Sequence, residues 1–181
     1  DGNWKQRKFG ELLKEFSKRS TVENEYTVLS STTLGMEIRD GRVSGVSNIG
    51  YKIIKDGDLV LSPQNLWLGN ININSIGIGL VSPSYKTFQI VGVNQNFLAS
   101  ILKSAHMLNA YRSASTQGAS VVRRNLNIAQ FHEITVKIPS KREQEMIGNL
   151  FLSLTKTVAI HQQKLYELKK IKRTLLQRML I

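Results

Sequence analysis

The sequence has 181 residues, of which 41% are hydrophobic, so we expect one globular domain with one appendage and not two full domains. It has no cysteine, no apolar run long enough to cross a membrane and no signal-peptide core. This excludes disulfides, thiol nucleophiles and cysteine zinc sites and indicates a cytoplasmic protein, neither membrane-bound nor secreted. Its 25 Lys and Arg against 13 Asp and Glu give a formal net charge of +12, so nucleic acid is the leading class of partner, ahead of an acidic protein or lipid surface.

The first periodic segment covers residues 4–17. Leu12, Leu13 and Phe16 recur there at helical spacing, which predicts a short amphipathic helix packed on the domain.

Residues 26–138 carry mainly strand and turn signals. The segment YTVLSSTTL is rich in β-branched residues, D-G pairs stand at 40–41 and 56–57, and apolar and polar residues alternate through 71–76. These patterns predict short strands of a curved antiparallel or mixed sheet. An amphipathic helix predicted over 94–115 would cover this sheet, and we interpret His106, near its apolar stripe, as a partly buried structural histidine rather than a metal ligand or base.

A second, much longer helix is predicted to begin at about residue 141. Ser140 and Glu143 form a capping-box pattern, Pro139 favours an extended residue before it, and no proline follows. The fold class expected is therefore α+β: a sheet domain with covering helices over 1–139, then a long coiled-coil-type helix over 140–181.

Along this helix, mainly apolar residues recur at alternating steps of four and three residues and form one stripe, which we call the seam. Such a 3.5-residue repeat is typical of a helix that needs a partner helix, and about forty residues span roughly 60 Å, longer than a small domain is wide. The alternative is a long helix that packs only on its own domain. Polar residues on the seam would fix register or oligomeric state. The seam consists of Ile147, Phe151, Leu154, Val158, His161, Leu165, Leu168, Lys172, Leu175 and Met179.

Signals of catalysis are weak. The three histidines, His106, His132 and His161, fall on separate predicted elements, and the segment HEIT lacks the second histidine of a zinc-protease motif. Asp56 and Asp58 flank a glycine and indicate a turn. We predict a binding protein with no catalytic residue and no metal site.

The best candidate for DNA contact is the segment 111–127. It joins a loop of small polar residues to a basic pair, and glycine allows close approach of the backbone to a phosphate or base edge. The alternative is a solvated loop whose basic pair forms salt bridges. The candidates here are Ser115, Thr116, Gln117, Gly118, Ser120, Arg123 and Arg124, and three further ones rest on charge alone: Arg39, Arg42 and Lys52.

Several segments together resemble one half of the specificity (DNA-recognition) subunit of a type I restriction-modification system. In chain order they are WKQRKFGELL, GYKIIKDGDLVLSP, VSPSYKTFQI, STQGASVVRRNLNIAQFHEITVKIPS and the tail that begins KREQEMIGNLF. The resemblance implies two target recognition domains, each reading half of a bipartite site in double-stranded DNA, separated by two long antiparallel helices. It also implies docking of methyltransferase (modification) and motor-nuclease (restriction) subunits. The S-adenosylmethionine, ATP and Mg would belong to those partners, and the specificity subunit itself would catalyse nothing.

The sequence departs from that pattern because it has one predicted recognition domain and one long helix. It is therefore half of a longer subunit or a natural half-subunit, and we expect it to pair through the seam with a second copy or second half. For a homodimer, symmetry predicts a palindromic bipartite site. Two alternatives remain open: an interaction scaffold whose basic charge is incidental, and a DNA-modifying enzyme.

Overall fold

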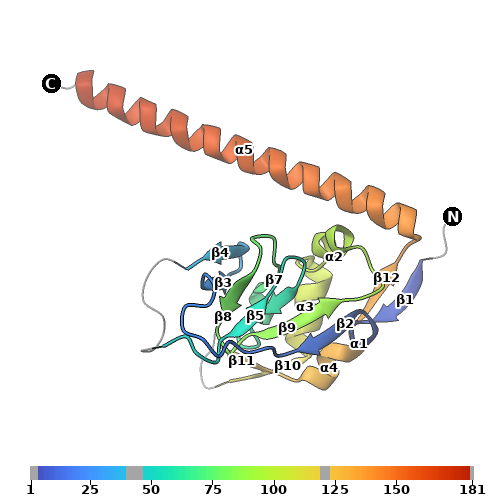
Figure 1. Ribbon diagram of the computed structural model, residues 1–181. Helices are drawn as coiled ribbons and strands as arrows, with labels where there is room; N and C mark the ends of the chain where they lie inside the picture. The colour runs from blue at the N-terminus through green and yellow to red at the C-terminus, as the bar shows by residue number, and fades with distance from the viewer. Residues whose placement is uncertain (1–3, 40–46, 119–122, 180–181) are drawn as a thin grey trace.

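The computed structural model describes residues 4–39, 47–118 and 123–179 and shows a small α+β domain followed by one long helix (Figure 1). The predicted fold class is confirmed. The elements are β1 (Lys5–Lys8), α1 (Phe9–Leu12), β2 (Leu13–Phe16), β3 (Leu29–Ser31), β4 (Met36–Ile38), β5 (Lys52–Ile54), β6 (Leu59–Leu61), the 3₁₀ helix η1 (Leu66–Leu68), β7 (Ile71–Ile73), β8 (Gly79–Val81), β9 (Lys86–Ile90), α2 (Gln95–Ile101), α3 (Ala105–Ser113), β10 (Ser115–Gln117), β11 (Arg124–Leu126), α4 (Ile128–Glu133), β12 (Thr135–Ile138) and α5 (Lys141–Met179).

The strands pair antiparallel. The largest sheet has the order β2-β9-β6-β7, and two-stranded pairs form between β1 and β12, β3 and β4, β5 and β8, and β10 and β11. The predicted turn at 56–57 is confirmed: Gly57 has a φ of 83°, and an Asp58 carboxylate oxygen accepts from the Lys55 N–H at 2.7 Å. The acidic pair beside this glycine is thus turn chemistry.

The main core lies between this sheet and helices α1 to α4. Its centre is aromatic: Phe9, Phe88, Tyr111 and Phe131 are fully buried, and the Phe9 and Phe131 ring centroids lie 5.2 Å apart. The Tyr111 hydroxyl donates to the Leu102 carbonyl at 3.0 Å, so this buried phenol has a partner.

The prediction of a helix over residues 4–17 is wrong. Only α1 is helical there, and Lys8, which precedes it, provides no side-chain cap. The flanking residues are strands: β1 pairs with β12, with Lys5 opposite Ile138, and β2 pairs with β9, with Leu13 opposite Ile90. Pairing with strands far along the chain overrides the local helical spacing.

The helix predicted over 94–115 is interrupted. It forms two helices, α2 and α3, and the Ser104 hydroxyl accepts from the Met107 N–H at 3.4 Å and so caps the second one. This change of direction leaves His106 exposed rather than partly buried.

The start of α5 confirms the predicted capping box. The Ser140 N–H donates to a Glu143 carboxylate oxygen at 3.0 Å, and the Glu143 N–H donates to the Ser140 hydroxyl at 3.4 Å. The Ser140 hydroxyl also donates to this carboxylate at 2.7 Å, and these hydrogen bonds lower the pKa of Glu143. The helix then continues over 39 residues.

Two residues fasten the first turns of α5 to α2. The buried Gln144 side chain accepts from the Asn94 N–H at 2.8 Å and donates to the Pro139 carbonyl at 2.9 Å. One turn later, a Cβ at Gly148 would lie 2.7 Å from the Phe97 nitrogen, so only glycine fits this crossing. The direction of α5 relative to the domain is therefore set by its first two turns.

Candidate nucleic-acid interface

The candidate segment forms a β-hairpin, β10–β11. Ser115 pairs with Leu126, Thr116 with Asn125 and Gln117 with Arg124. Both strands lie on the side of the domain away from α5 (Figure 1). A second helix paired with α5 would consequently leave the hairpin accessible.

The Arg124 guanidinium forms hydrogen bonds within the hairpin and to the end of α3. Its Nε donates to the Ser115 hydroxyl at 2.8 Å, and its Nη2 donates to the carbonyls of Ser115 at 2.7 Å and Arg112 at 3.3 Å. The Ser115 hydroxyl also donates to the Arg112 carbonyl at 3.1 Å and is buried. The prediction that Ser115 and Arg124 contact DNA is not supported by this geometry, because both side chains brace the fold.

Gly118 also serves the hairpin. Its N–H donates to the Arg123 carbonyl at 2.9 Å, and a Cβ at this position would lie 2.8 Å from the same oxygen. The close approach predicted for this glycine is thus to its own chain. Thr116, Gln117 and Arg123 are exposed on the hairpin, whereas Ser120 lies outside the described residues.

Sequence reasoning missed a neighbouring contact that supports the hairpin. The Arg112 guanidinium lies over the Trp67 ring, 5.6 Å from its centroid, and the Arg124 N–H donates to the Gln64 carbonyl at 3.1 Å. The segment that contains η1 is therefore joined to α3 by the cation–π contact and to the hairpin by the backbone hydrogen bond. No spacing in the sequence indicates this pair, because the two partners lie 45 residues apart.

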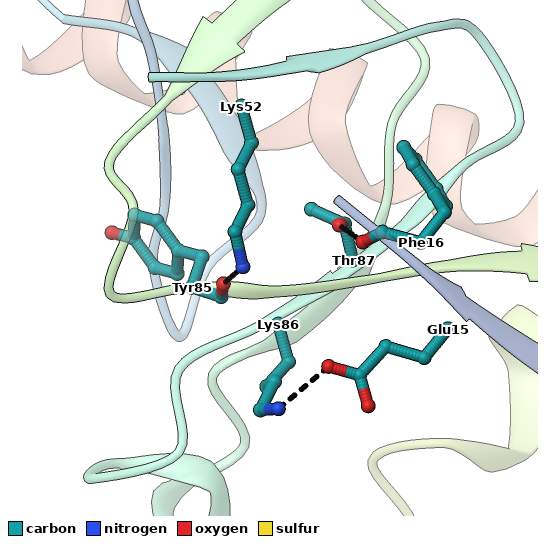
Figure 2. A network of polar contacts seen from close by, with 6 residues as sticks. All are labelled: Glu15, Phe16, Lys52, Tyr85, Lys86 and Thr87. Atoms are coloured by element: carbon teal, nitrogen blue, oxygen red, sulfur yellow. Dashed lines mark hydrogen bonds and ion pairs between the residues drawn. The ribbon is translucent and has the colours of Figure 1, made fainter. Parts of the chain in front are cut away.

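Lys52 is buried and hydrogen-bonded within the domain. Figure 2 shows its ammonium pointing to the carbonyl of Tyr85, the residue just before β9, which accepts from Lys52 Nζ at 2.5 Å. The residue is 6% exposed, and burial, together with the nearby Lys86 charge, lowers its pKa. This geometry does not support the predicted phosphate contact at Lys52, because the amine joins β5 to the segment just before β9.

The same region contains a link between β2 and β9. Lys86 pairs with Glu15 at 2.6 Å, and the Thr87 hydroxyl donates to the Phe16 carbonyl at 2.5 Å (Figure 2). Of the other residues proposed from charge, Arg39 is half-buried after β4, where its N–H donates to the Val28 carbonyl at 2.9 Å. Arg42 lies outside the described residues.

The predicted seam of α5 is exposed along almost its whole length. Ile147 is partly buried and packs against the main core, but every residue from 149 to 179 is exposed. Leu154, Val158 and Leu165 each leave about half of their surface in solvent, at 50%, 53% and 52%. His161 and Lys172 are exposed on the same seam. An exposed and mainly apolar seam of this length is typical of an interaction site.

A comparison with protein families decides the classification. The model of the type I restriction modification DNA specificity domain matches residues 2–170. The chain belongs to this family.

Solved structures show the same fold as this specificity domain. The HsdS subunit from Thermoanaerobacter tengcongensis is 16% identical with a TM-score of 0.63, and the match covers 96% of this chain and 47% of that one. The S subunit of a type I restriction-modification system from M. genitalium is 15% identical with a TM-score of 0.57, covering 86% and 40%. A chain from a structure of complex assembly in the type I R-M system is 12% identical with a TM-score of 0.61, covering 88% and 44%. This chain thus spans less than half the length of each, and no curated protein matches it.

The histidines of this specificity domain lie apart. His132 packs against Phe88 and Phe131, His106 lies beside a hollow of about 480 Å³ between the β1–β12 pair and α3, and His161 lies on α5. Within the described ranges no group of three His, Asp or Glu side chains could hold a metal ion. Across the same ranges, no helix is long and apolar enough to span a bilayer.

Proposed function

We propose that this specificity domain reads one half of a bipartite DNA site and uses α5 as half of a spacer that pairs with a second long helix. One observation carries the proposal: α5 is fastened to the domain over its first two turns, and its apolar seam is then exposed over the next 31 residues, from 149 to 179. A helix held at one end and uncovered along an apolar seam is suited to fix the distance between two readers.

The charge of α5 favours an antiparallel pair. Six Lys and Arg and one Glu lie between residues 164 and 178, whereas residues 141–155 carry two basic and two acidic residues. A parallel pair would place the two basic segments side by side and cost energy through repulsion. An antiparallel pair sets each basic segment against a neutral one, and His161, close to the midpoint of α5, would lie near the twofold axis.

The second helix is supplied by a second copy of this chain or by the other half of a longer subunit. In the assembled complex, the DNA-bound specificity domains bring methyltransferase (modification) and restriction subunits to the site. The S-adenosylmethionine, ATP and Mg used for the chemistry belong to those partners, so this chain binds and positions but does not catalyse. Its membership of the specificity-domain family supports this assignment.

Sedimentation of the purified chain tests the spacer. We expect a dimer at micromolar concentration and a monomer for Leu154→Glu, because Leu154 lies on the seam and is exposed in the single chain. Ser153→Glu is the matched control, since Ser153 is the exposed neighbour off the seam, and it should leave the dimer intact. A monomeric wild-type chain at high micromolar concentration would contradict homodimerisation.

DNA affinity at several salt concentrations tests the reader. If about six phosphates are contacted, the affinity should fall roughly a thousandfold between 50 and 200 mM salt. An affinity that does not change with salt would contradict DNA recognition and favour a scaffold whose charge is incidental.

A further inference from the structure

We infer that the outward face of the β10–β11 hairpin reads base edges and that Asn125, with Thr116 beside it, determines specificity there. This inference rests on the proposed DNA-recognition function. It names a residue, Asn125, that sequence reasoning did not select, and it assigns the base contact to Asn125 rather than to the predicted candidate Gln117.

The strand register separates the two faces of the hairpin. Ser115 and Leu126 oppose each other, as do Gln117 and Arg124. Ser115 is buried, Leu126 packs against the main core and Arg124 braces the hairpin. Because side chains alternate along a strand, this set faces the domain.

The pair between these two faces the other way. Thr116 and Asn125 are directly opposite each other and both are exposed. Opposed residues of an antiparallel pair have their Cβ atoms about 5 Å apart on one face, so the two side chains form a single polar patch. Among the described residues, neither side chain has a hydrogen-bond partner.

Three amides in this region have different roles. Gln117 is exposed but belongs to the domain-facing set with Arg124. The Asn127 side chain accepts from the Gln130 N–H at 3.2 Å and caps α4. Asn125 is therefore the amide of this segment that faces outward with both its donor and its acceptor available.

The chemistry of this patch fits a base edge. A two-stranded ribbon can enter the major groove, where an asparagine amide pairs with the N6 and N7 atoms of adenine and a threonine contacts a base through its hydroxyl or methyl group. The ribbon is also held in place, by the Arg124 side chain, which donates to the Ser115 and Arg112 carbonyls, and by the Arg124 N–H, which donates to the Gln64 carbonyl. Such support keeps a reading side chain in a defined geometry.

Selection of bound duplexes from a random library by the purified full chain tests the inference. For Asn125→Ala we expect the base preference at one position of each half-site to fall about tenfold or more, while binding to random DNA changes less than twofold. Gln117→Ala is the matched control on the opposite face and should select the wild-type sequence.

Two results would overturn the inference. The first is an Asn125→Ala variant that selects the same sequence as wild type with the same preference. The second is an equal loss of selected and random binding, which would make Asn125 a phosphate contact. A wild-type chain that selects no sequence would instead overturn the proposed function and, with it, this assignment.

Discussion

Replacing Gln144 by alanine should destabilise the protein far more than an ordinary helix substitution. The side chain is 4% exposed and bonds the Asn94 N–H and the Pro139 carbonyl at 2.8 and 2.9 Å. Truncation leaves two poorly solvated backbone groups without partners, each costing about 1–3 kcal/mol. The helix propensity of alanine recovers only a few tenths of a kcal/mol. We therefore expect a loss of roughly 2–4 kcal/mol, which for a chain of this length lowers the Tm by about 4–15 °C.

Urea and thermal unfolding, followed by circular dichroism at one protein concentration, measure this loss. Glu145→Ala is the control because Glu145 is the exposed neighbour on the same helical turn, and its effect should stay within about 0.5 kcal/mol. A Gln144→Ala variant as stable as wild type would refute the reasoning that this side chain fastens α5 to α2.

Three further predictions follow from individual contacts. Gly148→Ala should lower the Tm, although alanine normally favours a helix by about 1 kcal/mol, because its Cβ would meet the Phe97 nitrogen at 2.7 Å; a raised Tm would show that α5 does not cross α2 there. Carboxyl NMR of Ser140→Ala should show the pKa of Glu143 rising toward its ordinary value, because the hydroxyl that stabilises the carboxylate is gone. In wild type, the stabilisation from this pair is present at neutral pH and is lost as the pH falls through the lowered pKa. An unchanged pKa in the variant would contradict the cap. Lys52→Met should leave the salt dependence of DNA binding unchanged, because the amine is hydrogen-bonded to a carbonyl inside the domain. A weaker dependence of DNA affinity on salt in the variant, measured by fluorescence anisotropy, would show that Lys52 contacts a phosphate.

The sequence was sufficient to predict those features that depend on interactions between residues close together in the chain. The Ser140 and Glu143 pair lies three residues apart, so its cap could be predicted from spacing, and the length of α5 could be predicted from the repeating seam together with the absence of proline. The helix predicted over 4–17 failed because β1 pairs with β12, some 130 residues later.

The candidate site shows the same division. A basic, small-residue segment could be located from composition, but net charge does not show which arginine or lysine is bonded inside the fold. Arg124 and Lys52 both use their donors on carbonyls of the domain. Asn125 was missed because its orientation depends on the register of β10 and β11, which no short motif specifies.

The site bound by the purified wild-type chain tests the central claim most directly. Sequencing of duplexes selected from a random library should give two half-sites in inverted orientation, separated by a constant number of unread bases, because an antiparallel pair of α5 helices fixes both symmetry and distance. A single uninterrupted site, or two half-sites at variable separation, would contradict the account.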